Sequence, residues 1–396
     1  MSEFTYSSPQ SALEALLARI APNATESVAL VDAAGRVLAE SIVADRDSPP
    51  CDVSAMDGFA VRAEDCGKEP LPIVGAPRIG VAPPPLAPRA ALRIVTGAAL
   101  PPGADAVVRH EDAHVEGDTM RAWIAIRPGT SIRRRGENLR AGSPVIPAGT
   151  IINPAVAGAL ATFGIARPLV HRSVRIAVMT SGDEIVSVES SPHEWHIRNS
   201  NGPALKAMFD GLPFVSPADA RHVEDDEQSL REAVRESLER SDALVLTGGV
   251  SMGERDFIPS VLHSLGVEVL FHRLPQRPGK PILAGIAPRG QPVLALPGNP
   301  VSVLVTARRF VVPTLRRVAG VPTPEHVSAV TLEEADDAPI PLWWHRPVRL
   351  IGVGRGSLVA GRGSGDIASA ARSDGFVEIP PNSSGAGPWP FLPWTA

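Results

Sequence analysis

The sequence predicts a multidomain α/β plus β protein whose central domain is a doubly wound, mostly parallel α/β domain. Two observations lead to this fold class. Near-continuous apolar runs alternate with helical segments between residues 173 and 320, which is typical of a parallel sheet covered on both faces. Short β-type runs separated by proline-rich turns lie on either side of that region, so smaller β-rich pieces flank the central domain.

The bulk composition limits both the architecture and the partners. The chain has 396 residues, which corresponds to two to four domains at about 150 residues each. A formal charge of −5 argues against a protein that coats nucleic acid or an anionic membrane. Cys51 and Cys66 form no C-x-x-C pair, no apolar run reaches about 18 residues, and the first residues show no signal peptide. We expect a soluble cytoplasmic protein with no nucleic-acid or membrane partner.

Two helix-start signals mark the flanks of an inserted piece. Ser8-Pro9 and Asn153-Pro154 each place a capping residue before a proline, and an apolar stripe follows the first of them. We expect the two helices to pack together in an extended helical domain formed by residues 1–52 and 139–172. Residues 53–138 are expected to form an inserted, small β-rich domain.

The α/β domain is expected at residues 173–320. Its predicted strands and helices alternate, and they are Val174–Met179, Pro203–Phe209, Gln228–Arg240, Ala243–Leu246, Val293–Leu296 and a helix after Asn299-Pro300. Residues 321–396 are expected to form a C-terminal β domain. Its predicted strands are Val327–Val330, Val348–Val353 and Phe376–Ile379, and the Pro/Trp-rich tail Gly387–Pro393 is expected on the surface.

Three polar loops follow predicted strands of the α/β domain, namely Thr180–Glu184, Thr247–Asp256 and Pro297–Ser302. Ligands bind beyond the carboxyl ends of strands in open α/β sheets, so we expect these loops to surround a phosphate-bearing ligand. Gly248, Gly249 and Gly253 allow backbone N–H groups to approach an anion, and Asn299-Pro300 starts a helix whose N-terminus attracts one. Any one of these loops alone would be interpreted as a tight turn, but three on successive strands favour a ligand site.

Charged residues in and near these loops suggest a metal and an oxyanion. Asp183, Glu184, Glu254 and Asp256 are oxygen donors that suit Mg²⁺ beside a phosphate, although helix capping is an alternative role. Arg273, Arg277 and Lys280 supply cations, and arginine suits tetrahedral oxyanions. The spacing around Lys280 is not that of a Walker motif. The histidine pairs His110/His114 and His193/His196 lack the spacing or further ligands of a metal centre.

Seven ordered motifs resemble those of the molybdopterin molybdenumtransferases, of which the animal protein gephyrin carries a related module. The motifs are Ser54–Ala60, Val95–Gly97 with Pro102–Val108, Arg134–Asn138, Ser181–Glu184, Thr247–Asp256, Pro278–Pro281 and Leu296–Ser302, with Gly363–Gly365 echoing the C-terminal domain. The match covers nearly the whole chain, and seven motifs in one order are far more specific than a lone glycine pattern.

The resemblance implies a homodimer with four domains per chain, including a molybdopterin-binding α/β domain and a small C-terminal domain similar to a β-barrel. It implies that molybdate is inserted into adenylylated molybdopterin in the presence of Mg²⁺, giving molybdenum cofactor and AMP. Implied protein partners are the molybdopterin adenylyltransferase and molybdoenzyme apoproteins. The active cleft of the family lies between the α/β domain of one subunit and other domains of its partner.

Site residues follow from the resemblance by position in this sequence. The implied catalytic residues are Asp57, Thr96, Glu184, Asp226 and Asp256, of which Glu184 and Asp256 would also hold the metal. The substrate-binding residues expected from the loop chemistry and the resemblance together are Asn138, Gly248, Gly249, Ser251, Gly253, Arg273, Arg277, Lys280, Pro297, Asn299 and Pro300. Arg273 and Arg277 would hold molybdate bidentately.

Departures from the family pattern keep two alternatives open. The family commonly has aspartate at Asn138 and lysine at Arg273 and Arg277, and it commonly has an aromatic residue and asparagine at Cys51 and Val53. These changes are compatible with a weakened paralogue that acts as a molybdopterin-binding or scaffold protein. Molybdopterin adenylylation is the second alternative, but that activity needs only a domain such as residues 173–320.

Overall fold

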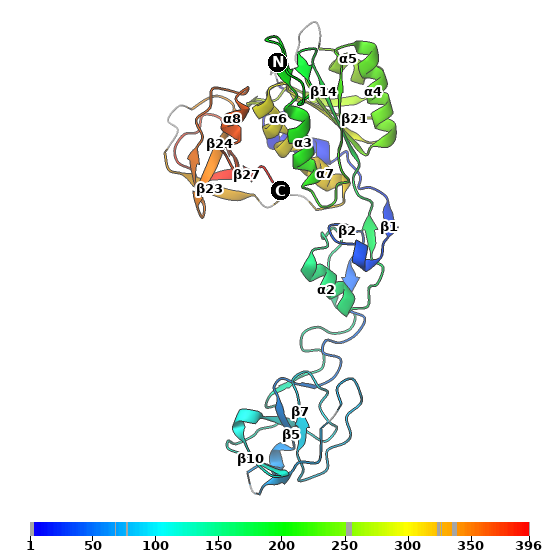
Figure 1. The fold of residues 1–396 in the computed structure, drawn as a ribbon, viewed down its shortest axis with the longest axis vertical. Coiled ribbons are helices and arrows are strands. Elements are labelled where there is room, and N and C mark those ends of the chain that lie inside the picture. The colour runs from blue at the N-terminus through cyan, green and yellow to red at the C-terminus, as the bar shows by residue number, and fades with distance from the viewer. Residues whose placement is uncertain are drawn as a thin grey trace. The chain divides into compact units, whose positions relative to one another are not determined.

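The computed structural model describes residues 4–67, 69–76, 78–250, 256–322, 325, 327–334 and 339–395. They form two compact units. The first comprises Met1–Glu40, Ala148–Gly158 and Ala166–Ala396, and the second comprises Ser41–Pro147 and Ala159–Ile165. The α/β domain and the C-terminal β domain both belong to the first unit, as the green-to-red ribbon in Figure 1 shows. Within the described residues, no helix is long and apolar enough to cross a membrane.

The α/β domain is built on a six-stranded sheet in the order β17-β14-β18-β22-β21-β19. The strands are β14 (Ile176–Ser181), β17 (Asp219–Val223), β18 (Ala243–Thr247), β19 (Glu268–His272), β21 (Leu283–Ile286) and β22 (Pro292–Leu296). The first four in sheet order are parallel, and β21 and β19 add an antiparallel edge. Every residue of β14, β18 and β22 is buried, as continuous apolar runs predict.

Helices cover both faces of this sheet, which confirms the doubly wound prediction. On one face, Val178 and Val245 share a core with α3 (Asn201–Asp210), α6 (Pro300–Thr306) and α7 (Val312–Val318). On the other face, Met179 and Leu246 share a core with α4 (Glu227–Arg240) and α5 (Ile258–Ser264). Successive side chains of a strand point to opposite faces, so each strand supplies both cores.

The N-terminal helix α1 (Pro9–Leu17) packs on the α/β domain rather than on the second predicted helix. The Ser8 hydroxyl caps it by accepting a hydrogen bond from the Ser11 N–H at 3.0 Å. Leu13 and Leu16 enter the core that contains Phe271 and Phe310. The second helix, α2 (Pro154–Thr162), buries only Leu160, which is not part of the core that α1 enters.

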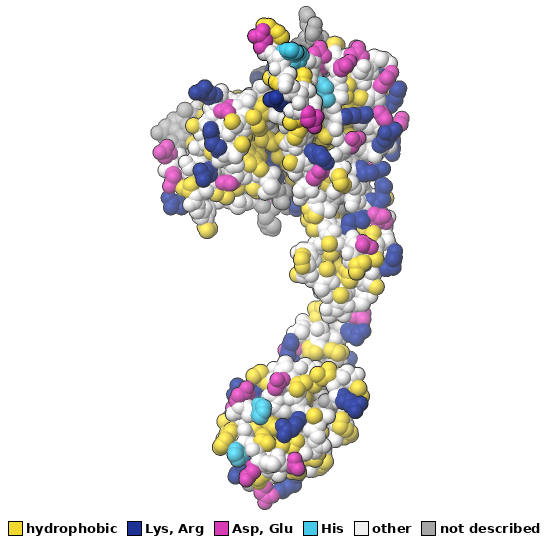
Figure 2. Space-filling view, in the orientation of Figure 1, with side chains coloured by type: hydrophobic (Ala, Val, Ile, Leu, Met, Phe, Trp, Pro, Cys, Tyr) yellow, Lys and Arg dark blue, Asp and Glu magenta, His cyan; other side chains and the backbone are white. Residues whose placement is uncertain are grey.

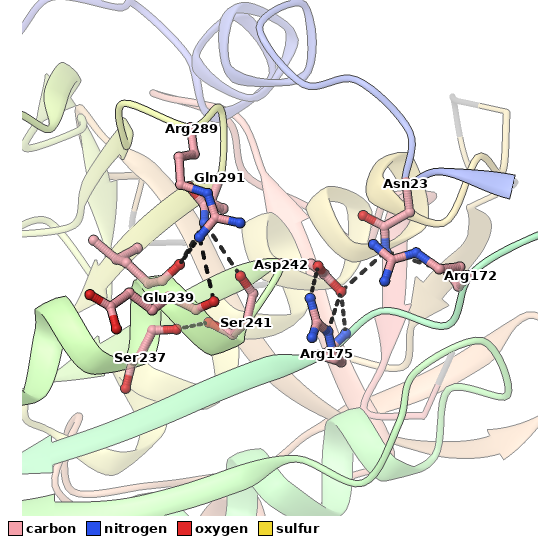
Figure 3. A network of polar contacts seen from close by, with 10 residues as sticks. Asn23, Arg172, Arg175, Ser237, Glu239, Ser241, Asp242, Arg289 and Gln291 are labelled. Atoms are coloured by element: carbon pink, nitrogen blue, oxygen red, sulfur yellow. Dashed lines mark hydrogen bonds and ion pairs between the residues drawn. The ribbon is translucent and has the colours of Figure 1, made fainter.

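A polar network holds the chain where it leaves and re-enters the α/β domain (Figure 3). The Asp242 carboxylate accepts hydrogen bonds from the Asn23 amide at 3.2 Å and from the Arg175 guanidinium at 2.9 Å. Burial raises the pKa of Asp242, but the hydrogen bonds from Arg175 outweigh it and leave the pKa below its usual value. A small antiparallel sheet lies between Asn23 and Arg175 in the sequence. Its strands are β1 (Thr25–Ser27), β2 (Val37–Leu38) and β13 (Leu169–His171).

The same figure shows which side chains donate hydrogen bonds to the carbonyl groups at the C-terminal end of α4. Side chains of Arg289 and Gln291 donate to the carbonyl of Leu238, and further bonds reach the carbonyls of Glu239 and Ser241. The last carbonyls of a helix have no partner within the helix, so these donors replace water there. Charges of both signs are interspersed over the outer surface of the α/β domain on the face that Figure 2 shows.

The C-terminal domain is a small closed barrel of five strands. They are β23 (Ser328–Leu332), β24 (Trp343–Gly352), β25 (Arg355–Leu358), β26 (Gly375–Ile379) and β27 (Trp389–Pro393). The order is β24-β25-β23-β27-β26, and pairing of β26 with β24 closes the ring. The surface assignment of the tail was wrong, because β27 buries Phe391 in the barrel and Leu392 against α6.

A short strand from the α/β domain joins the barrel sheet. β20 (Gln276–Arg277) runs parallel to β24, with Arg277 opposite Trp344. Phe376 and Leu392 of the barrel also pack against Val301 and Val305 of α6. The segment Arg273–Lys280 is therefore shared between two domains that the sequence analysis separated at residue 320.

The second unit is β-rich. β5 (Gly58–Val61) pairs with β7 (Leu92–Ile94) and β8 (Ala106–Arg109). The other strands of this unit are β3 (Ile42–Val43), β4 (Val53–Ser54), β6 (Leu71–Pro72), β9 (Ala113–Glu116), β10 (Thr119–Ala122), β11 (Ile132–Arg133) and β12 (Pro144–Ile146). Phe59 and Ala60 belong to different apolar clusters of this unit, because β5 places successive side chains on opposite faces.

Candidate functional site

A cavity of about 700 Å³ lies at the carboxyl ends of β14, β18 and β22. We call it the acidic cavity, because its lining includes the carboxylates of Glu184, Asp225 and Asp256. Seven residues predicted from the sequence line it, namely Glu184, Gly248, Gly249, Asp256, Pro297, Asn299 and Pro300. The parallel strands end at one edge of the sheet, so loops separated by more than a hundred residues meet here.

The loop after β18 requires glycine at one position. Gly248 has a φ of +93°, and a Cβ atom there would lie 2.5 Å from the Ser181 carbonyl oxygen at the end of β14. No side chain fits at that distance. The two loops therefore approach each other backbone to backbone, which leaves the N–H groups of this turn close to the cavity.

Two asparagines that the sequence analysis did not single out also line the acidic cavity. Asn199 donates to Thr180 Oγ1 at 2.8 Å and accepts from the Gly202 N–H at 2.9 Å. Asn201 is 5% exposed, and its amide donates to the Gly298 carbonyl at 2.8 Å. Its Oδ1 has no hydrogen-bond partner among the described residues. The sequence signal, Asn-Ser-Asn-Gly at the beginning of α3, is the same as that of an ordinary helix start.

The two neighbouring aspartates before α4 have different roles. Asp226 caps the helix, because its carboxylate accepts a hydrogen bond from the Ser229 N–H at 2.8 Å. Asp225 lines the acidic cavity instead. Burial raises the pKa of Asp225, and the charges of Asp183 and Glu184 act in the same direction. The structure thus places Asp225, rather than the predicted Asp226, beside the other carboxylates.

A second cavity of about 810 Å³ lies between the α/β domain and the barrel. We call it the basic cavity, because its lining includes Arg277, Lys280, Arg346 and Arg362 but no aspartate or glutamate among the described residues. Pro281, Pro297 and Asn299 line both cavities. A cation-rich cavity without carboxylates suits a small oxyanion.

The N-terminus of α6 is not open to a ligand in the way the sequence analysis expected. The Val301 N–H donates to the Ser364 carbonyl at 2.9 Å, and the Asn299 amide donates to Ser364 Oγ at 3.0 Å. The barrel loop therefore satisfies donors that were predicted to bind phosphate. Only the tertiary contact reveals this capping, since Ser364 is 65 residues from Asn299.

Three predicted residues belong to the second unit. Asp57 is exposed, and one carboxylate oxygen accepts from both the N–H and the hydroxyl of Thr96, at 2.7 and 2.8 Å. Both hydrogen bonds lower the pKa of Asp57 and keep it ionised, and the one from the backbone N–H of Thr96 has the larger effect. Asn138 accepts a hydrogen bond from Arg133, and Arg133 also pairs with Glu137.

Of the remaining predictions, Arg273 is absent from the described lining of both cavities, and its N–H donates to the Ile282 carbonyl. Ser251, Gly253 and Glu254 lie outside the described residues. No group of three or more His, Cys, Asp or Glu side chains in the described part of the chain is arranged to hold a metal ion by itself.

Comparison with known proteins supports the resemblance. Residues 7–164 match the model of the MoeA N-terminal region, domains I and II, and residues 177–317 match that of a probable molybdopterin binding domain. The chain is 38% identical to the molybdopterin molybdenumtransferase of Synechococcus elongatus, over 77% of this chain and 78% of that protein. The chain belongs to the molybdopterin molybdenumtransferase family.

Other members of the family agree over most of the chain. The molybdopterin molybdenumtransferase of Staphylococcus aureus strain Mu50 is 31% identical over 91% of this chain and 88% of that protein. The crystal structure of the molybdopterin biosynthesis moeA protein of Pyrococcus horikoshii OT3 matches with a TM-score of 0.82 and 27% identity, over 98% of this chain and 99% of that one. The family, the molybdopterin-binding domain and the small barrel are therefore confirmed.

Proposed function

We propose that the protein inserts molybdenum from molybdate into adenylylated molybdopterin, giving molybdenum cofactor and AMP. The observation that carries this proposal is the pair of adjoining cavities, one lined by carboxylates and the other by cations, with Pro281, Pro297 and Asn299 in common. An enzyme that joins a phosphate-bearing organic ligand to a tetrahedral dianion needs two such sites next to each other.

In this proposal the adenylylated molybdopterin occupies the acidic cavity. The Gly248-Gly249 turn offers backbone N–H groups to its phosphates, and Asn201 offers a buried amide oxygen to a donor on the ligand. Molybdate occupies the basic cavity, where Arg277, Lys280, Arg346 and Arg362 compensate its charge. Arg277 keeps the role predicted from the sequence, and the lining arginines of the barrel take the place of Arg273.

The residues of the acidic cavity fit Mg²⁺ that arrives with the phosphates. Glu184, Asp225 and Asp256 line one wall, and Mg²⁺ is usually bound by one or two carboxylates together with phosphate oxygens and water. Such an ion would neutralise charge on the phosphoanhydride and stabilise the departing AMP.

This chain's own residues bind and orient the two substrates. Lys280 and the arginines bind the oxyanion through their N–H groups, and the arginines do so without giving up a proton, since a guanidinium stays charged at neutral pH. The prolines shared by both cavities have fixed backbone angles, so the common wall is stiff. Holding both reactants in one place replaces a bimolecular encounter and removes much of its entropic cost.

We also propose that two copies of the chain form the working enzyme. Asp57, Thr96 and Asn138 would then complete the cleft from the second copy, with the ionised Asp57 available to the metal or to the reacting groups. Protein partners consistent with this role are the molybdopterin adenylyltransferase, which supplies the substrate, and molybdoenzyme apoproteins, which receive the product.

The proposal is tested by release of AMP. Purified protein is incubated with adenylylated molybdopterin, Mg²⁺ and molybdate, and AMP is quantified against a reaction without molybdate. Molybdate-dependent release is expected. Absence of molybdate-dependent release would refute the enzyme activity and favour a molybdopterin-binding or scaffold role, whereas ATP-dependent formation of adenylylated molybdopterin would identify the adenylyltransferase activity.

A further inference from the structure

Three side chains at the edge of the basic cavity share one face of the barrel sheet. Trp344 and Arg346 are two residues apart on β24, so they point to the same side of the strand. Arg277 of β20 lies directly opposite Trp344 in the parallel pairing. The strand pairing thus brings two arginines from different domains to one aromatic ring.

Both guanidinium groups contact the same indole ring. The Cζ atom of Arg346 lies 4.2 Å from the ring centroid of Trp344, and that of Arg277 lies 5.7 Å from it. These distances are within the range of cation–π attraction. The ring itself is held in place, because Trp344 packs against the barrel core of Val330, Val348 and neighbouring residues.

The two arginines are close enough to oppose each other electrostatically. Burial lowers the pKa of Arg346, and the charge of Arg277 lowers it further. Both side chains line the basic cavity, whose described lining contains no carboxylate to offset them. An anion bound between them relieves this repulsion, so the free energy stored in the pair favours occupancy of the cavity.

We propose that Trp344 is a positioning residue that fixes the spacing of the Arg277 and Arg346 guanidinium groups and thereby sets the affinity for the tetrahedral oxyanion. This inference rests on the proposed function of the basic cavity. The contact with Trp344 also suits arginine at position 277. A planar guanidinium stacks on an indole and still presents two N–H groups to an oxyanion, which a lysine ammonium does not do.

The test compares molybdate binding by two variants of Trp344 with that by a variant of the neighbouring Trp343. Trp344→Leu removes the ring, Trp344→Phe keeps a smaller ring, and Trp343→Phe is the matched control. Trp343 has no cation–π contact within the described structure, and its indole N–H donates to the Ser7 carbonyl at 3.2 Å. Binding of sodium molybdate to each protein is measured by titration calorimetry, and the molybdate dependence of AMP release gives KM and kcat.

The expected result is graded. Trp344→Leu raises both the dissociation constant and the KM for molybdate about tenfold, while kcat changes less than threefold. Trp344→Phe raises the dissociation constant and the KM about threefold. Trp343→Phe leaves both constants within about twofold of those of the natural protein. A double-mutant cycle adds Arg277→Lys. This change should weaken molybdate binding in the natural protein but have little further effect in Trp344→Leu, because the ring that orders the guanidinium is already gone.

The outcomes separate the two proposals. If the unaltered protein releases AMP and binds molybdate while Trp344→Leu and Trp344→Phe keep its dissociation constant, the role of Trp344 is refuted and the proposed function stands. Equal effects of Trp343→Phe and Trp344→Phe would also refute it, since they would reflect loss of packing in the barrel. If Trp344→Leu does not fold, Trp344→Phe and the cycle Trp344→Phe/Arg277→Lys decide the question. Failure of the unaltered protein to release AMP refutes the proposed function instead.

Discussion

Asn299 and Ser364 join the α/β domain to the barrel at the wall shared by the two cavities. The Asn299 side-chain amide donates to the Ser364 hydroxyl at 3.0 Å, and the Ser364 carbonyl accepts from the first turn of α6. Ser364 lines the basic cavity, and the next residue, Gly365, lines the acidic cavity. The loop that contains them therefore separates the two proposed substrates, and it is anchored to the helix that both cavities touch.

Ser364→Ala tests this anchor. The variant removes the hydrogen bond from Asn299 but keeps the backbone bond to Val301, so we expect a loss of about 0.5–1 kcal/mol in the free energy of unfolding. We also expect a higher KM for both substrates, because the loop borders both cavities. Urea unfolding and steady-state AMP release measure the two effects. An unchanged KM for both substrates would show that the loop only connects the domains.

Gly248→Ala tests the close approach of the loops after β14 and β18. Its Cβ would meet the Ser181 carbonyl at 2.5 Å, so we expect more than 2 kcal/mol of destabilisation, or a shifted loop with AMP release reduced at least about a hundredfold. Gly290→Ala is the control. Gly290 has a similar φ of +87° but no atom within 4 Å of its Cβ position, so it should cost only about 1 kcal/mol and leave activity intact. Equal effects on activity would contradict the steric argument.

Three aspartate variants distinguish the two carboxylates that line the acidic cavity from the one that caps α4. Asp225→Asn and Asp256→Asn remove charges from the acidic cavity, so we expect AMP release to fall at least about a hundredfold at saturating Mg²⁺ with little change in melting temperature. Asp226→Ala removes the helix cap and should cost about 1 kcal/mol of stability while turnover per folded molecule is kept. Loss of turnover in Asp226→Ala alone would restore the role predicted from the sequence.

A buried charge cluster gives the barrel interface a defined pH dependence. Glu378 of β26 accepts hydrogen bonds from Arg309 at 2.6 Å and from His345 at 3.1 Å. Burial would raise the pKa of Glu378, but the hydrogen bond from His345 and the charge of Arg309 outweigh it and lower the pKa to about 2. A carboxylate with a lowered folded-state pKa stabilises the protein above its unfolded pKa, and this contribution is lost as the pH falls toward 2.

We therefore expect the free energy of unfolding to decrease by about 3 kcal/mol between pH 6 and pH 2 through this group alone. Glu378→Gln should be destabilised by about 3 kcal/mol at pH 7, because the buried Arg309 loses its counter-charge, and its stability should vary less with acid pH. Glu333→Gln, which loses only an exposed ion pair with Arg355, is the control and should behave as the natural protein. Parallel pH profiles of Glu378→Gln and the natural protein would contradict this account.

Local patterns in the sequence determine the α/β domain and its reactive edge. Apolar runs set the strands β14, β18 and β22, since a strand buried on both faces tolerates few polar residues. Parallel strands end at one edge, so the loops bearing Glu184, Gly248 and Asn299 meet whatever the details of packing. The position of this edge therefore follows from the sequence alone. The motifs at the edge also identify the family without the structure.

Only the tertiary structure decides which polar groups are already engaged and which chain segments belong together. Asp225 and Asp226 are identical in type and adjacent, but the direction of each side chain follows from where α4 begins. Ser364 caps α6, and Arg277 meets Trp344 through a strand pairing between domains, because long-range packing brings together residues that no local pattern relates. The sequence alone determines the sheet edge that lines the acidic cavity, whereas the basic cavity exists only because the barrel packs against the α/β domain.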